Sequence, residues 1–264
     1  MKISTPCKTC NPAVALALAL AMALPRAMAQ TDEAPTATPY RPSFSTPAAL
    51  SAPGWLEVEA GGLRAGGGGA RRDSLPYTFK LAFTPDWGVR LSAEAWVQQT
   101  DASGARQSGG GDSAVVLKRR FAMDDASAFG IELGATLPTA PAGIGSGKSD
   151  TSLTGIYSAD LGQYHTDLNL GFTRVGLVAA GEGRIQTLWA ASLSKALNER
   201  WGLVGEFSGT RREGVPSTSQ FLVAASYNFS TTLVFDAGLA RSTRSHVPDW
   251  SAFAGFTWLA ARIF

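Results

Sequence analysis

Trp250–Phe264 reads W-S-A-F-A-G-F-T-W-L-A-A-R-I-F and is the stretch that decides the fold class. Its even positions are almost all apolar and include Phe256, Trp258 and Phe264, whereas its odd positions also hold Ser, Gly and Thr. A period of two is typical of a β-strand, and two unlike faces mean that its two sides meet different surroundings. The stretch therefore predicts a strand with an apolar face and a mixed face.

The same alternation recurs upstream. In the first such segment, near Trp55–Leu63, one face carries Leu56 and Val58 and the other carries Glu57 and Glu59. About twelve such segments of about 9–12 residues follow one another, and this length crosses a bilayer when the strand is tilted. The 29 glycines and the dispersed aromatic residues fit the same class. We predict an all-β fold, an antiparallel transmembrane β-barrel of about 12 strands over residues 54–264.

The connections between these segments alternate in length. Short ones are expected at Thr84–Trp87, Ala122–Ala128, Leu161–Tyr164, Leu197–Trp201 and Asn228–Thr231. Longer ones, rich in Gly, Ser or Pro, are expected at Arg64–Ser74, Gln99–Gly111, Pro138–Asp150, Arg174–Arg184, Arg211–Pro216 and Arg241–Pro248. Outer-membrane barrels have short periplasmic turns and longer external loops, so we predict that the longer connections are external.

The last strand of such a barrel must close against the first. An aromatic residue after alternating apolar positions resembles the assembly signal of bacterial outer-membrane proteins. We therefore assign Phe256, Trp258 and Phe264 to this signal, with the barrel assembly machinery as the partner that reads it.

Met1–Ala29 has the pattern of a secretory signal peptide, with a basic start, an apolar run at Ala13–Leu24 and a small-x-small site before Gln30. The apolar run is about 12 residues, short of the roughly 20 that a spanning helix needs. Cys7 and Cys10 would leave with this segment, so we assign them no redox or metal chemistry.

Residues 30–53 are rich in Pro, Ala, Ser and Thr and lack a strand pattern. Proline cannot donate to a sheet ladder, and the composition buries little surface. We predict a Pro-rich periplasmic N-terminal extension, with an inner plug segment as the other placement.

Charge and motifs exclude several functions. Three of the 23 Lys and Arg residues leave with the signal, so the rest nearly balance the 21 Asp and Glu and leave no nucleic-acid footprint. Gly143–Ser149 resembles the end of a phosphate-binding loop, but Ala142 stands where that motif needs Gly. The only histidines, His165 and His246, fall at opposite ends of the predicted barrel, and no G-x-S-x-G elbow occurs. No catalytic, cofactor-binding or metal-binding residue is predicted.

The mixed faces should point into the barrel and carry charges of both signs. The side chains expected in the lumen are Glu57, Glu59, Lys80, Arg90, Glu94, Lys118, Arg120, Glu132, Asp167, Glu206 and Asp236. Such charges belong either to a wet lumen or to a salt-bridge network that fills a narrow barrel, and both interpretations stay open. Opposite charges across a pore would also shape its selectivity.

A few charges share the outward parity. Arg119, Lys195 and Arg262 are expected at the periplasmic rim and Arg174 at the external end. A lipid-facing charge costs about 2–4 kcal/mol at the bilayer midplane but about 0–1 kcal/mol near the rim, so these positions are tolerable.

A set of motifs spans nearly the whole mature chain. They are R-P-S-F-S-T-P at Arg41–Pro47, W-L-E-V-E-A-G at Trp55–Gly61, Y-T-F-K-L-A-F and W-G-V-R-L within Tyr77–Leu91, G-D-S-A-V-V-L-K-R-R-F at Gly111–Phe121, L-P-T at Leu137–Thr139, H-T-D-L-N-L-G-F-T-R at His165–Arg174 and G-L-V-G-E at Gly202–Glu206. In these motifs the chain resembles the outer-membrane transporter-like family described as the "MetA-pathway of phenol degradation". The resemblance implies a barrel linked with uptake of aromatic or other hydrophobic compounds, and no catalytic residues.

We predict an outer-membrane channel or transporter of a Gram-negative bacterium, for passive uptake of small solutes that include aromatic or hydrophobic compounds. Its partners would be outer-membrane lipid, the assembly machinery and the solute, and no nucleic acid. One alternative is a non-conducting structural or adhesive barrel, which a blocked lumen would favour. A barrel hydrolase is the other, and it needs a Ser within hydrogen-bond reach of His165 or His246.

Overall fold

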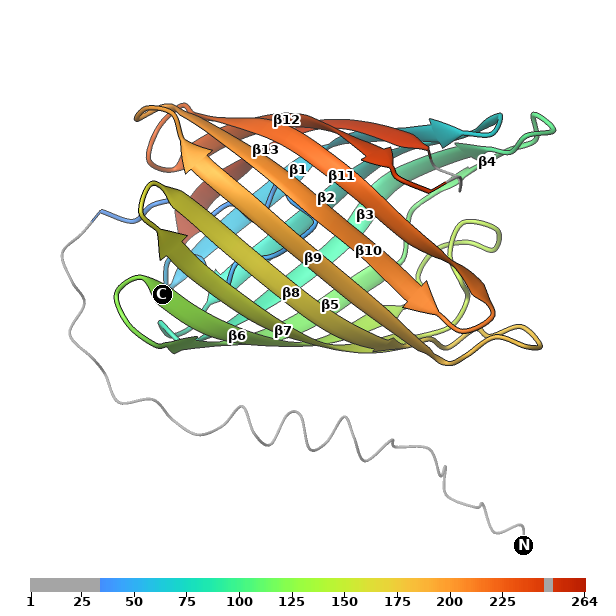
Figure 1. The fold of residues 1–264 in the computed structure, drawn as a ribbon, viewed down its shortest axis with the longest axis horizontal. Helices are drawn as coiled ribbons and strands as arrows, with labels where there is room; N and C mark the ends of the chain where they lie inside the picture. Colours follow the sequence, from blue (N-terminus) through green and yellow to red (C-terminus); the bar gives the residue numbers. More distant parts are fainter. Residues whose placement is uncertain (1–33, 245–248) are drawn as a thin grey trace, which may run out of the picture. The chain divides into compact units, whose positions relative to one another are not determined.

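Twelve long strands form a closed antiparallel barrel in the computed structural model, which describes residues 34–244 and 249–264 (Figure 1). The sheet closes because β1 pairs with β13 as well as with β2. A short additional strand, β4, pairs with the far end of β3. The strands are β1 (Trp55–Gly67), β2 (Ala70–Ala82), β3 (Trp87–Thr100), β4 (Arg106–Gly109), β5 (Ser113–Ala122), β6 (Ser127–Leu137), β7 (Asp150–Leu161), β8 (Tyr164–Arg174), β9 (Ile185–Ala196), β10 (Trp201–Arg212), β11 (Val215–Asn228), β12 (Leu233–Ser242) and β13 (Trp250–Arg262). The predicted antiparallel barrel of about 12 strands is confirmed.

The barrel is apolar outside and polar inside. On β9 and β10, Leu193 and Phe207 face outward and are 49% and 44% exposed. Glu206, the residue before Phe207, points inward and is 1% exposed. An outer apolar band over a polar interior is the pattern that a bilayer solvates.

The closing contact is the pairing of β1 with β13. It runs from Trp55 opposite Arg262 to Gly66 opposite Trp250, with one register irregularity near the start of β1. Beyond β13 the chain keeps bonding to the start of the barrel, since the N–H of Ile263 donates to the carbonyl of Gly54 over 2.7 Å. The expectation that the last strand closes against the first is confirmed.

Phe264→Ala is expected to lower the amount of folded barrel while leaving export unchanged, because the ring covers the point where the seam begins. A Cβ built on Gly54 would lie 3.5 Å from two ring atoms of Phe264. Heat-modifiable gel mobility of membrane fractions measures the folded yield. Phe229→Ala is the matched control, since Phe229 is a similarly exposed aromatic in a turn. Equal yields for parent and Phe264→Ala would remove the role assigned to this ring.

The short connections occur where the sequence predicts them. They are residues 83–86, 123–126, 162–163, 197–200 and 229–232. All of them lie at the barrel end that also receives residues 35–54, which we call the short-turn end. The prediction of short connections is therefore confirmed at the short-turn end.

Two of the six connections predicted to be long are tight hairpins instead, and this corrects the sequence analysis. Arg64–Ser74 is almost entirely strand, and the chain turns at Gly68 and Gly69, whose φ angles are 57° and 82°. Only glycine adopts two successive positive φ angles readily, and this geometry matches the twist of a two-residue hairpin. Arg211–Pro216 likewise turns within residues 213–214.

The physical reason is that strands continue beyond the apolar band. The outward positions there carry charged residues such as Arg64, Arg71 and Asp73, so the apolar alternation disappears although the β1–β2 ladder continues. Gln99–Gly111 shows the same effect, since β3 reaches Thr100 and β4 pairs back onto it. Loss of alternation is therefore a poor sign of loop structure at this end of the barrel.

Residues 35–53, here called the plug segment, lie inside the barrel and form no helix or strand, apart from a single bridge between Pro53 and Ala82 (Figure 1). Tyr40, Ser45, Ala48 and Ser51 are buried. This corrects the prediction of a periplasmic extension over residues 30–53 for the part that is described. The composition does exclude strand structure, but side chains of the barrel wall accept the backbone N–H groups. The predicted signal peptide lies outside the described residues.

Candidate functional site

The lumen at the short-turn end is filled by the plug segment, which bonds to the wall on all sides. On the β1–β2 side, Glu57 accepts the N–H of Thr38 and Glu59 accepts that of Tyr40, each over 2.7 Å. Lys80 lies between these carboxylates, 2.5 Å from Glu57 and 2.6 Å from Glu59. Its ammonium also donates to the carbonyl of Thr38 over 2.7 Å. Two acids and one lysine of the wall thus fix the first part of the segment.

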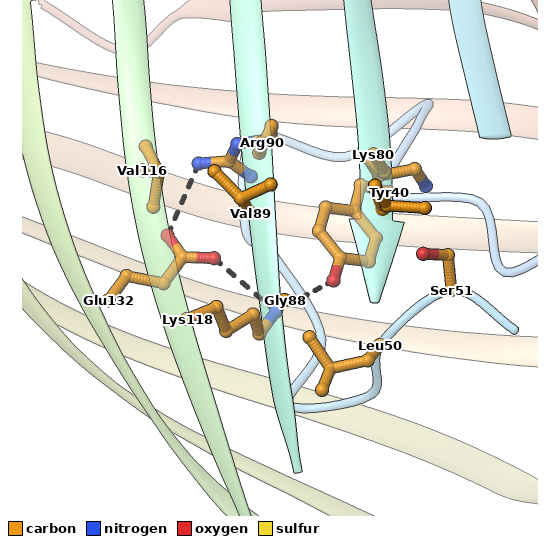
Figure 2. Close-up of a pocket in the computed structure, with 11 residues that line it drawn as sticks. Tyr40, Leu50, Ser51, Lys80, Gly88, Val89, Arg90, Val116, Lys118 and Glu132 are labelled. Atoms are coloured by element: carbon orange, nitrogen blue, oxygen red, sulfur yellow. Dashed lines mark hydrogen bonds and ion pairs between the residues drawn. The ribbon is translucent and has the colours of Figure 1, made fainter. Parts of the chain in front are cut away.

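Tyr40 is the anchor of the segment. Its ring centroid lies 3.9 Å from Nζ of Lys80, 4.3 Å from Nζ of Lys118 and 5.7 Å from the guanidinium of Arg90. Figure 2 shows the ring among these three cations. Each contact of a buried cation with an aromatic face contributes about 0.5–2 kcal/mol. The phenol donates to the carbonyl of Ala49 over 2.6 Å, which folds the segment back on itself.

Glu132 balances the charge around this ring. Its carboxylate lies 3.2 Å from Arg90 and 3.3 Å from Lys118 (Figure 2). Burial, followed by the carboxylate of Glu132, raises the pKa of Tyr40 well above its usual range. The phenol therefore stays protonated and keeps its bond to Ala49.

Arg41 reaches the opposite wall. Its guanidinium donates through two nitrogens to the carboxylate of Asp236, 3.0 Å each. The side chain passes Gly61 on β1 and Gly255 on β13, which are register partners. A Cβ there would lie 2.9 Å and 2.7 Å from Nη2 of Arg41, so both positions leave the room that the guanidinium occupies. A bidentate buried pair of this kind is directional as well as strong.

The middle of the segment bonds to β8 and β10. Ser45 donates its N–H and its hydroxyl to Glu206 over 2.7 Å and 2.8 Å. Thr46 and Asn169 exchange bonds, since the N–H of Thr46 donates to the amide oxygen over 2.8 Å and the amide nitrogen donates back over 2.9 Å. This reciprocal pair imitates one step of a β-ladder.

Ala48 is held on β6 and β7. It packs against Ala128 and Ile156 in a small buried cluster, and its N–H donates to the hydroxyl of Ser158 over 2.7 Å. That hydroxyl in turn donates to Asp167. The wall therefore makes both apolar and polar contacts with the segment. The cavity between Tyr40 and the wall has a volume of about 10 Å³.

The structure places most of the predicted lumen residues around the plug segment. Those that contact it directly or through one other side chain are Glu57, Glu59, Lys80, Arg90, Lys118, Glu132, Asp167, Glu206 and Asp236. Glu94 lies at the other end and pairs with Arg72. Arg120 is half-buried and forms no ion pair within the described part of the chain. The assembly-signal residues Trp258 and Phe264 are exposed on the outside, and Phe256 is half-buried.

Sequence reasoning missed Tyr40, Arg41 and Ser45 as site residues. One signal could have found them, because acids outnumber bases among the predicted inward charges. An inward set with surplus carboxylates needs donors from elsewhere. Arg41 and the backbone N–H groups of the plug segment are these donors.

The outward charges lie where they are tolerable. Arg119 stacks 5.0 Å from the ring centroid of Trp87, and Lys195 lies 5.3 Å from that of Tyr164. Arg262 is exposed at the end of the seam, opposite Trp55. Aromatic partners at the rim keep these cations out of the apolar band.

The hydrolase alternative lacks its geometry at His165. The two ring nitrogens lie 2.6 Å from Asp160 and 3.2 Å from Asp167, so carboxylates take both. His246 lies outside the described residues. Within residues 34–244 and 249–264, no group of three His, Cys, Asp or Glu is placed to hold a metal ion. The same ranges contain no helix with the length and apolarity to cross a membrane.

No protein-family model matches the chain, and no curated protein sequence does. Among solved structures it is similar to an outer membrane channel from Pseudomonas putida F1, with a TM-score of 0.63 and 14% identity over 80% of this chain and 97% of that one. It is also similar to the NanC porin (TM-score 0.56, 9% identity, 78% and 100% covered). The CymD monoaromatic hydrocarbon channel matches with a TM-score of 0.51 and 10% identity over 81% and 90%. The chain therefore has the fold of outer-membrane β-barrels.

Proposed function

We propose that the protein is an outer-membrane channel for passive uptake of small solutes, and that the plug segment closes it. The observation that carries this proposal is the chemistry of the contact between segment and wall. Wall groups such as Glu206 and Asp236 hold the segment through hydrogen bonds and ion pairs, which water can replace if the segment leaves. The segment is joined to the barrel through Gly54, so it can move without breaking the sheet. A purely structural barrel would need no such exchangeable interior.

The solute class that fits best is small, aromatic or hydrophobic compounds. One side of the lumen is apolar, with Leu222, Ala224 and Ala240 in a buried cluster against Val204 and Phe253. An apolar wall opposite charged groups suits a solute with an apolar body and a polar end. The similarity to a channel named for monoaromatic hydrocarbons and the family resemblance support the same class.

A non-conducting structural barrel is the second candidate, and the plug segment itself favours it. A planar-bilayer recording from the refolded full chain separates the two. Discrete current steps are expected from the parent at low frequency, and more often from a variant with a weakened plug. The absence of current steps from both the parent and this variant would contradict the channel and favour the structural barrel.

The proposed location is the outer membrane of a Gram-negative bacterium, reached with a cleaved signal peptide and the barrel assembly machinery. The outward apolar band requires a bilayer, and the short connections are gathered at one end, as in barrels with periplasmic turns. In this orientation the longer connections and the extended hairpins face outside.

Single cysteines test this orientation. Ser108→Cys on β4 and Ser146→Cys in the connection between β6 and β7 should react with an impermeant maleimide on intact cells. Asp125→Cys and Ser230→Cys, in short turns, should react only after the membrane is opened. The mature chain has no other cysteine, so the signal is unambiguous. The reverse labelling pattern would show that the barrel is inverted.

A further inference from the structure

The outer face of β9–β13 carries an open apolar groove of about 770 Å³. Its floor is low because small side chains meet in register, with Ala225 opposite Ala237 on the next strand and Ala237 opposite Ala254 on the one after. The exposed side chains of Leu193 and Leu203 form its far wall. Lipid would contact a smooth barrel face without preference for position, whereas a groove with walls can hold one acyl chain in a fixed place.

An arginine in register between two aromatic residues lies at the mouth of this groove, at the end of the longer connections. Phe221, Arg241 and Trp250 are register partners across β11, β12 and β13. Each lies two residues beyond a groove residue of its own strand and shares its outward face. Trp250 extends over Gly66 of β1, where a Cβ would lie 3.3 Å from the indole. Arg241 therefore lies in register between two outward-facing aromatic residues at the mouth of the groove.

The charge of Arg241 is not neutralised by the described residues. Arg64 and Arg71, on the neighbouring strands, both pair with Asp73 at 2.6 Å and 2.5 Å. Arg241 forms no ion pair within residues 34–244 and 249–264, and it is exposed. At the opposite end of the groove, Lys195 lies over the ring of Tyr164. Among the described residues, the groove therefore has an unpaired positive charge at one end and an apolar length below it.

We infer that the groove binds an acyl chain of a membrane lipid whose headgroup phosphate is held by Arg241. Arginine bonds to phosphate through two parallel N–H groups, and flanking aromatic rings place it at headgroup depth. In the proposed orientation this end faces the outer leaflet, so the occupant is a phosphorylated glycolipid of the lipid A type. This inference rests on the proposed outer-membrane placement.

Native mass spectrometry of the purified full chain in detergent micelles tests the site, with diphosphorylated lipid A as the probe. Arg241→Gln is expected to weaken binding about tenfold or more, since it removes a charge-assisted bond. Arg174→Gln is the matched control, because Arg174 is an exposed outward arginine at the same end of β8, away from the groove. It should bind as the parent does. Ala237→Phe, which fills the floor, should also weaken binding while the barrel stays heat-modifiable.

Three outcomes would overturn the inference. Equal binding by the parent and Arg241→Gln, or equal loss in Arg174→Gln, would show that no specific headgroup site exists. Equal affinity for dephosphorylated lipid A would remove the phosphate contact. Displacement by inorganic phosphate alone would show an anion site without a lipid. Conductance in bilayers that lack lipid A tests the channel proposal separately, so failure of one proposal is distinguishable from failure of the other.

Discussion

Arg41→Ala is expected to raise the fraction of time that the lumen conducts by about 100-fold or more. Arg41 is the partner of Asp236, whose side chain is 3% exposed. Removing one member of a buried ion pair costs about 3–5 kcal/mol, because the remaining charge stays buried without compensation. This cost is paid only while the plug segment is docked, so it shifts the equilibrium toward the undocked segment. About 1.4 kcal/mol corresponds to a tenfold change in the ratio of undocked to docked molecules. The wall carboxylate is relieved when the segment leaves and water enters.

Single-channel recording of the refolded full chain measures this effect directly. Arg64→Ala is the matched control, since Arg64 pairs with Asp73 on the outside and its side chain is 54% exposed. Exposed pairs contribute about 0–1 kcal/mol, so the control should conduct like the parent. If Arg41→Ala folds and conducts no more often than the parent, the plug segment is not the closing element.

Lys118→Glu is expected to destabilise the barrel strongly. The ammonium of Lys118 lies 3.3 Å from Glu132 and donates to the phenol of Tyr40 over 3.1 Å and to the carbonyl of Pro47. The substitution removes these bonds and places a second carboxylate beside Glu132 in a site where the side chain is 3% exposed. The loss should reach about 3–5 kcal/mol, and the urea midpoint of the heat-modifiable form should fall accordingly.

Arg120→Glu makes the same charge change two residues away on the same inward face. Arg120 is half-buried and has no ion pair among the described residues, so its substitution should keep the fold. It should instead shift the reversal potential toward cations in a salt gradient. The shift should shrink at high salt, because the screening length falls to about 3 Å at 1 M. Equal destabilisation by both substitutions would contradict the assignment of Lys118 to the packed network and Arg120 to the mouth of the lumen at the short-turn end.

The strand faces could be predicted because a bilayer imposes a strict two-residue period. Glu57 and Glu206 fall on the face opposite their apolar neighbours, and this parity alone places both inside the barrel. The partners of these carboxylates could not be predicted. Thr38 and Ser45 bind them through backbone N–H groups, which every residue except proline has, and the Ser45 hydroxyl adds a bond that many polar residues could make, so no residue type marks the contact. Tertiary proximity decides it.

The extended hairpins were also beyond reach of the pattern. The turn at Gly68 and Gly69 is a recognisable hairpin signal, but Arg64–Ser74 around it has no apolar alternation. Its ladder continues with charged residues at the outward positions in place of apolar ones. Only the part of each strand that faces lipid shows the apolar alternation from which its position can be predicted.

The route taken by Arg41 has a consequence for the order in which the chain assembles. Its guanidinium crosses the β1–β13 junction between Gly61 and Gly255 to reach Asp236 on β12. These three residues come together only when the two ends of the sheet have met. The docking place for the first described segment is therefore created by the last strand to be synthesised. The bond between Arg41 and Asp236 can therefore form only in a barrel whose first and last strands have already paired.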